Sequence, residues 1–413
     1  MALLKVKNIG PIRSGLNEND GFVEFSGVTV LIGDQGTGKS TIAKIFSTLS
    51  WLEKALVRGD FSGDYVSRYR RFKKHLGYQN IINYLNKDSF IEYHGDTIKI
   101  VYQNERLKVT KLQEAEDYLF PKIMYVPAER NFVSSVDKPD LVKRLPLTIY
   151  TFLDEYEDAK EALADEVHLP IEGSRFEYKK NNKKSWLVGD DFKVNLLEAS
   201  SGFQSLVPLF LVTRHLSELI QKKESTSHRE ISVNDEKEIR KEIERILKSG
   251  KLSEDVKRVL LEKLSARFTY SRFINIVEEP EQNLYPTSQK HVLYELLNYK
   301  NQVTANQLVL TTHSPYIVNY LTLAIKAAEV KHKISNCDNE RQDDLFVKLS
   351  KIVPLKSSVE HNEVNIYQLS PDGTIKKLPE YHNLPTDENL LNQLLASSND
   401  AFIELLKIED QCQ

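Results

Sequence analysis

Cysteine is almost missing from this chain, which has only two in 413 residues, Cys337 and Cys412. Two thiols this far apart supply neither the framework of a disulfide-rich secreted domain nor the paired spacing of a zinc site. Such sparing use of cysteine is typical of a reducing compartment. We therefore expect a cytoplasmic protein.

Long hydrophobic runs and a strong net charge are also absent. No apolar stretch approaches the roughly 20 residues that span a bilayer, and the first segment, MALLKVKNIGPI, lacks the apolar core of a secretion signal. We therefore expect no membrane partner. The formal net charge is -3 with 28% charged residues, so any DNA contact would need a local basic patch.

The most informative motif that is present lies near the N-terminus. The apolar run VTVLI at residues 28–32 leads into GDQGTGKS at residues 33–40, and helical spacing of apolar residues follows over 41–56. The spacing G-x-x-x-x-G-K-S predicts a loop whose backbone N–H groups surround phosphates at the positive end of a helix. We expect Lys39 to reach the β- and γ-phosphates of ATP and Ser40 to bind Mg²⁺. The expected nucleotide contacts are Gly33, Asp34, Gln35, Gly36, Thr37, Gly38, Lys39, Ser40 and Thr41.

A second motif, FINIVEEPE at residues 273–281, is an apolar strand that ends in two carboxylates. Hydrolysis of a phosphoanhydride needs a ligand for the metal and a base for the attacking water. We expect Glu278 to serve the magnesium and Glu279 to be the general base. The alternative is an ordinary acidic turn, but that reading does not explain its pairing with the phosphate loop.

The runs EEPEQNLYP at 278–286 and LVLTTHSPYIV at 308–318 resemble the soluble, non-transporter branch of the ABC-type ATPases. That branch includes chromosome-maintenance (SMC) proteins, OLD-family proteins and the ATPase subunits of phage-defence systems such as PARIS and Septu. The resemblance implies that His313 is a switch histidine at the γ-phosphate, with a catalytic role beside Glu279 and Lys39. It also places residues 281–283 in a loop that touches a partner subunit. It covers residues 3–48, 122–131, 197–219 and 273–319.

The same family needs a signature sequence, which completes the nucleotide site of the neighbouring subunit. The segment LEASSGFQ at residues 197–204 is similar to it. The resemblance implies that Ser200, Ser201, Gly202 and Gln204 contact the nucleotide of a second copy. An ordinary serine helix cap would explain one serine but not the whole run.

The segment KIMYVPAERN at residues 122–131 corresponds to the strand before the family's Q-loop. Many members have glutamine after Val-Pro, and this chain has Ala128. We therefore expect either Glu129 or Arg130 to sense the phosphate instead.

The alternation of buried strands and helices predicts an α/β class. Together with the resemblance it implies a P-loop NTPase with an ABC-type head, a mixed or antiparallel β lobe and a helical lobe with an insertion. We expect one domain over 1–413. Its expected parts are a phosphate-loop lobe (1–130, with a β insertion at 57–120), a helical signature lobe (131–272, with a charged helical insertion at 221–266), a core with the acidic strand and histidine (273–330) and a C-terminal hairpin and helix (331–413).

The functional expectation is an ATP-hydrolysing sensor or scaffold that controls a separate effector in bacterial anti-phage defence. Two copies would enclose ATP and Mg²⁺ head to tail, as a dimer or a higher assembly of dimers. The effector would be a Toprim-type nuclease or a toxin, released by a phage trigger, and we expect no nuclease in this chain. The alternative is a DNA repair ATPase, for which the basic and aromatic stretch 68–75 could contact DNA. The other reading of that stretch is a solvated helix face.

Overall fold

The computed structural model describes residues 1–410 with gaps at 69–70, 114–117, 143, 165 and 337–340, and with only 245–246, 256–257 and 260–261 of the segment 226–269. Most of the expected charged insertion, both cysteines and two residues of the basic stretch therefore lie outside the described residues. No described helix has the length and apolar content needed to cross a membrane.

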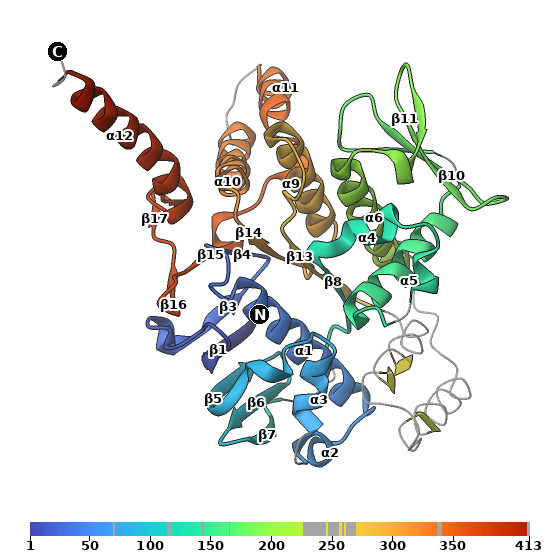
Figure 1. Cartoon of the computed structure of the whole chain (residues 1–413), viewed down its shortest axis with the longest axis vertical. Helices are drawn as coiled ribbons and strands as arrows, with labels where there is room; N and C mark the ends of the chain where they lie inside the picture. The colour runs from blue at the N-terminus through green and yellow to red at the C-terminus, as the bar shows by residue number, and fades with distance from the viewer. Residues whose placement is uncertain are drawn as a thin grey trace.

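A seven-stranded sheet forms the centre of the molecule (Figure 1). Five of its strands are parallel neighbours, and the phosphate-loop strand β4 lies between β14 and β15. The strand β13 and its neighbour β14 are buried along their whole length, as expected for strands covered on both faces. This sheet confirms the predicted α/β class. In order, the strands are β2 (Gly15–Leu16), β16 (Thr374–Lys377), β15 (Val364–Leu369), β4 (Val28–Gly33), β14 (Gln307–Thr312), β13 (Arg272–Glu278) and β8 (Pro121–Val126).

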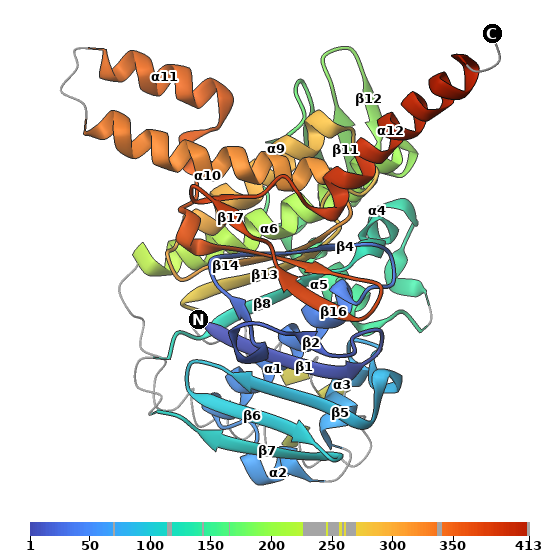
Figure 2. The same cartoon turned by 90° about the vertical axis from the view of Figure 1, so that its left-hand side faces the viewer.

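Helices cover the two faces of the central sheet unequally. Side chains alternate across a strand, so Val28, Val30 and Ile32 join one core cluster while Leu31 joins the other. The first cluster packs against α6 (Ser201–Ser225), α9 (Pro286–Asn301) and α10 (Pro315–Ser335), and the second against α1 (Lys39–Arg58). Figure 2 shows these layers one above the other.

Below α1 lies a five-stranded sheet of order β3-β1-β5-β6-β7, antiparallel throughout (Figure 2). Phe25 of this sheet stacks on Phe46 of α1 at 3.8 Å between ring centroids, which joins the sheet to the helix. Phe72, on α3, is buried, as expected for the solvated-face reading of the basic stretch. The elements are β1 (Ala2–Ile9), β3 (Val23–Phe25), α2 (Gly63–Ser67), α3 (Arg71–Gly77), β5 (Leu85–His94), β6 (Ile98–Gln103) and β7 (Arg106–Lys111).

The lobe before α6 differs from the expectation. A helical signature lobe is expected over 131–272, and its first part contains α4 (Phe132–Ser135) and α5 (Leu147–Glu161) but also a sheet. Strand β10 (Arg175–Lys179) alternates buried Phe176 and Tyr178 with polar residues, which is a strand period. It forms a four-stranded sheet with β9 (Val167–His168), β11 (Lys184–Val188) and β12 (Lys193–Asn195).

The C-terminal third returns to the central sheet and then leaves the body. The expected hairpin forms as β15 and β16, and β15 pairs with β4. After α11 (Gln342–Ile352) and the short pair β17 (Glu380–Tyr381) and β18 (Leu384–Pro385), the chain ends in α12 (Leu390–Asp410). Helix α12 projects away from the other elements in both views (Figures 1 and 2).

Candidate functional site

The turn from β4 into α1 is a glycine loop that no other residue type could form without strain. Gly33 and Gly38 have φ of 144° and 105°, in the region that side chains disfavour. A Cβ on Gly33 would lie 2.3 Å from the carbonyl oxygen of Leu369, and one on Gly38 would lie 2.9 Å from the side chain of Ile12. The loop is therefore shaped by the close approach of two other segments, through the backbone of Leu369 and the side chain of Ile12.

The start of α1 suits an anion. Gly38 is its N-cap residue, no side chain caps the helix, and its first turn has no acidic residue. The first N–H groups of a helix have no intrahelical partner, and the helix dipole is positive there. These residues fit the phosphates of a nucleotide. Of the other expected contacts, Gln35 and Gly36 are exposed, Asp34 and Ser40 are half-buried, and Thr37 and Thr41 are buried.

Lys39 is folded back over this loop. Its Nζ donates to the carbonyl oxygens of Gly33 at 2.8 Å and Asp34 at 2.7 Å, and it lies 3.4 Å from Nδ1 of His313. Burial lowers the pKa of Lys39 from 10.5 to about 8, although the carboxylate of Glu279 counteracts this shift. A buried ammonium without a full counter-charge favours an anionic ligand.

His313 connects Lys39 to the second predicted carboxylate. Its Nε2 lies 3.6 Å from Oε1 of Glu279, while its Nδ1 faces Lys39. Burial, helped by the charge of Lys39, lowers the pKa of His313 below its ordinary value, so the imidazole is neutral at neutral pH. Glu279 has a φ of 44°, which is unusual for a residue with a side chain. The three residues expected to be catalytic are thus brought together from β13, β14 and α1.

Glu278, the last residue of β13, faces a different set of groups. Its carboxylate accepts from the Tyr125 hydroxyl at 2.5 Å and from the Ala128 backbone N–H at 3.2 Å. A carboxylate has about four lone-pair positions, so these two bonds leave room for a metal or its bound water. The position fits the expected Mg²⁺ site. Tyr125, which fixes this carboxylate, was not expected from the sequence.

Glu281 turns inward instead of lying on the surface expected for a partner subunit. Its Oε1 accepts from the backbone N–H of His313 at 2.7 Å and from the Thr312 hydroxyl at 2.8 Å. Burial raises the pKa of Glu281. This side chain positions His313. Within the expected partner-facing loop Asn283 is exposed, and its amide donates to the Ser205 hydroxyl of the same chain at 3.2 Å.

Arg130 is placed differently from the expectation that it senses phosphate. It is fully buried, and its guanidinium donates to the carbonyl oxygens of Ser205 (3.2 Å), Glu278 (2.7 Å) and Glu279 (2.7 Å). These bonds tie α6 to the end of β13. Arg130 is therefore a structural clamp, and Glu129, which is exposed, is the member of the pair that could face a ligand.

The signature segment begins α6, at a surface. Ser200 and Ser201 are exposed, as a contact with a second copy requires. A Cβ on Gly202 would lie 2.8 Å from the carbonyl oxygen of Asn283, so glycine allows this helix start to approach the loop after β13. Gln204, which was expected to contact nucleotide, donates from its amide to the carbonyl oxygens of Leu196 and Leu197 within its own chain.

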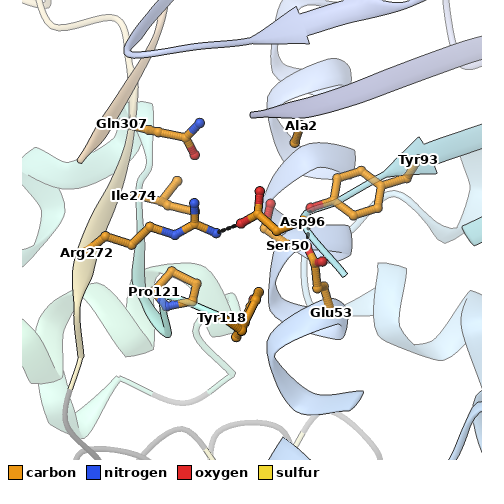
Figure 3. Close-up of a pocket in the computed structure, with 10 residues that line it drawn as sticks. All are labelled: Ala2, Ser50, Glu53, Tyr93, Asp96, Tyr118, Pro121, Arg272, Ile274 and Gln307. Carbon is orange, nitrogen blue, oxygen red and sulfur yellow. Dashed lines mark hydrogen bonds and ion pairs between the residues drawn. The ribbon is translucent and has the colours of Figure 1, made fainter. Parts of the chain in front are cut away.

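The opposite end of β13 holds a separate polar cluster (Figure 3). Arg272 donates to Asp96 at 2.5 Å, and Glu53 accepts from the Tyr93 hydroxyl at 2.9 Å. The enclosed volume is about 10 Å³, which is room for about one water molecule. This cavity is too small for a substrate.

One stretch of the chain matches a known family model. Residues 271–319 match the family model AAA_21, described as "AAA domain, putative AbiEii toxin, Type IV TA system". The matched range contains Glu278, Glu279 and His313. No curated protein matches the chain at a significant level.

Three solved structures are similar at low identity, each with a TM-score of 0.34. The SmcHead bound to the C-winged helix domain of ScpA is 12% identical and covers 77% of this chain and 90% of its own. The SMC head domain from Thermotoga maritima is 10% identical, with coverage of 92% and 100%. The Smc head domain with an extended coiled coil, bound to the C-terminal domain of ScpA derived from Pyrococcus furiosus, is 10% identical, with coverage of 92% and 96%. Similarity this distant carries no information about function.

Proposed function

We propose that this chain is an ATPase in which bound ATP holds two copies head to tail, and that the closed pair controls a separate effector in anti-phage defence. The convergence of Lys39, His313 and Glu279 on the glycine loop supports this proposal most directly. A buried cation, a neutral imidazole and a half-exposed carboxylate at one helix N-terminus are the groups that phosphoanhydride hydrolysis uses.

Each group has a distinct task. The loop N–H groups and Lys39 bind the phosphates, and Ser40 with Glu278 would hold Mg²⁺, which supplies positive charge for the phosphate oxygens. Glu279 accepts the proton of the attacking water as its oxygen bonds to the γ-phosphorus and the bond to ADP breaks. Neutral His313 can donate a hydrogen bond to the γ-phosphate, while Ser200 and Ser201 of the second copy would close the site.

The effector is part of the proposal because the matched family is described by a toxin and a type IV toxin–antitoxin system. We propose a Toprim-type nuclease or a toxin as the effector and a phage protein as the trigger. In cells, protection against phage should therefore require a neighbouring gene. Protection by this chain alone would contradict the separate effector.

ATP binding and hydrolysis should be separable by substitution. Glu279→Gln should bind ATP with a dissociation constant within about threefold of wild type but hydrolyse it at least 10²-fold more slowly, because the base is lost. Lys39→Ala should abolish binding. Glu360→Gln is a matched control, since Glu360 forms an exposed pair with His332 at 2.9 Å, far from the loop in sequence. Ordinary turnover in Glu279→Gln would remove Glu279 from its role, and strong stimulation by DNA would favour a DNA repair ATPase.

A further inference from the structure

The carboxylate of Glu278 lies in the core without a cation beside it. Glu278 is only 5% exposed, and its carboxylate forms no ion pair among the residues that the structure describes. A buried charge is normally paired with an opposite charge or bound to a metal. What Glu278 does have is two hydrogen-bond donors, and these decide how its carboxylate is oriented.

The pairing of two strands brings one of these donors, Tyr125, to the carboxylate. Strands β8 and β13 run parallel, and Tyr125 of β8 lies opposite Ile276 of β13. Side chains two residues apart on a strand share a face, so Ile276 and Glu278 point the same way. Tyr125 and Ile276 both belong to the core cluster that packs against α1, the helix that begins with Lys39 and Ser40. The Tyr125 hydroxyl therefore meets Glu278 on the face of the sheet that α1 covers.

The two donors hold both oxygens of the carboxylate. The Tyr125 hydroxyl donates to Oε1 at 2.5 Å, and the Ala128 backbone N–H donates to Oε2 at 3.2 Å. The first distance is in the short range of an O–H bond to a charged oxygen. A glutamate side chain has several rotamers, and two donors on different oxygens select one of them. Each oxygen keeps a second lone pair for another partner.

The backbone of Glu278 is held by a different group. Arg130 donates to its carbonyl oxygen at 2.7 Å, and Ala128 acts through the main chain. Tyr125 is thus the one described side chain that donates to the carboxylate itself. Removing its hydroxyl takes away a single oxygen atom and leaves the other two bonds in place.

We infer that Tyr125 is a positioning residue, which holds the Glu278 carboxylate in the orientation that binds Mg²⁺ and so sets how much the metal strengthens nucleotide binding. The inference rests on the proposed function, in which Glu278 is a Mg²⁺ ligand. Groups that hydrogen-bond to a metal ligand typically change metal affinity or activity by about 10- to 100-fold when they are replaced. Tyr125 acts through Glu278 and has no catalytic role of its own.

The test compares nucleotide binding with and without metal, so it does not depend on hydrolysis. The full chain is titrated with a fluorescent, non-hydrolysable ATP analogue, once in excess Mg²⁺ and once in EDTA. The ratio of the two dissociation constants measures what Mg²⁺ contributes. Tyr125→Phe should leave the dissociation constant in EDTA unchanged and reduce the contribution of Mg²⁺ at least ~10-fold.

Tyr93→Phe is the matched control. It also removes a buried tyrosine hydroxyl that donates to a buried glutamate, Glu53, at 2.9 Å, but in the separate polar cluster. It should change the Mg²⁺ contribution by less than about twofold, because it lies outside the shell of the metal. Equal effects of Tyr93→Phe and Tyr125→Phe would overturn the inference.

A double substitution tests whether Tyr125 acts through Glu278. Glu278→Gln should itself reduce the Mg²⁺ contribution, and adding Tyr125→Phe should change it by less than about twofold more. A further large reduction would overturn the inference.

The single variant has two contrary outcomes. An unchanged Mg²⁺ contribution with a lower melting temperature would make Tyr125 purely structural, and a larger contribution would mean that its hydroxyl competes with the metal. Either result overturns the inference and leaves the proposed ATPase intact. A wild-type chain that binds the analogue equally well in Mg²⁺ and EDTA would instead reject the proposed Mg²⁺ site.

Discussion

Replacing Arg130 tests whether this residue is a structural clamp or a phosphate sensor. In Arg130→Met, the carbonyl oxygens of Ser205, Glu278 and Glu279 lose the Arg130 donor, while that of Glu279 keeps its bond from the Gln282 backbone N–H at 3.0 Å. Each unsatisfied buried carbonyl costs about 1–3 kcal/mol, so loss of the donor at Ser205 and Glu278 should cost about 2–6 kcal/mol of folding free energy. At about 2.1 cal/mol/K per residue, a loss of ~4 kcal/mol lowers the melting temperature of a 413-residue chain by roughly 5 °C.

Differential scanning calorimetry without nucleotide measures this effect directly. Arg214→Met is the matched control, since Arg214 is on α6 but forms a partly exposed pair with Glu218 at 2.7 Å, worth about 0.3–0.5 kcal/mol. It should shift the melting temperature by less than about 1 °C. A melting temperature for Arg130→Met equal to that of the control, accompanied by lost ATP affinity, would refute the clamp and restore the phosphate-sensing expectation.

Three further predictions concern Glu53, Gly202 and Glu281. Burial raises the pKa of Glu53, so folding favours its protonated form and wild-type stability should fall as pH rises through that raised value. Glu53→Gln, which stays neutral, should flatten the difference between melting temperatures at pH 5 and pH 8, and an unaltered difference would contradict this. Gly202→Ala should lower the free energy of unfolding by about 1–3 kcal/mol, because the alanine methyl group would meet the Asn283 carbonyl. An unchanged melting temperature would contradict this close approach. Glu281→Ala should slow ATP hydrolysis at least ~10-fold with little change in ATP affinity, because His313 loses its positioning bond; an unaffected turnover number would disprove that role.

Much of the central fold could be predicted because its signals are local. The strands β4, β13 and β14 are uninterrupted apolar runs, and the glycine spacing marks the turn into α1. The sheet of β9 to β12 has weaker local signals. Strand β10 is five residues long and β9 only two, and their pairing depends on partners that a short sequence window does not contain.

The candidate site was also predicted only in part. Lys39, Glu279 and His313 meet as expected because each stands at the end of a buried strand or the start of a helix. The direction of a side chain is not local information. Whether Arg130 turns towards a ligand or into the core depends on carbonyl groups that lie far along the sequence. The Gln204 amide, in contrast, finds its acceptors on the preceding turn, where the resemblance implied a contact with nucleotide.

The order of strands in the central sheet also governs how the protein is made. Strand β4 is complete by residue 33, yet its two neighbours are residues 307–312 and 364–369. A chain emerging from the ribosome therefore carries the phosphate loop long before β14 and β15, the strands that pair with β4, have been made. Because contacts so distant in sequence form slowly, residues up to 369 must be made before the loop takes its working shape. Chains that lack these strands should accordingly be unable to bind ATP, which would keep incomplete copies out of the proposed head-to-tail pair.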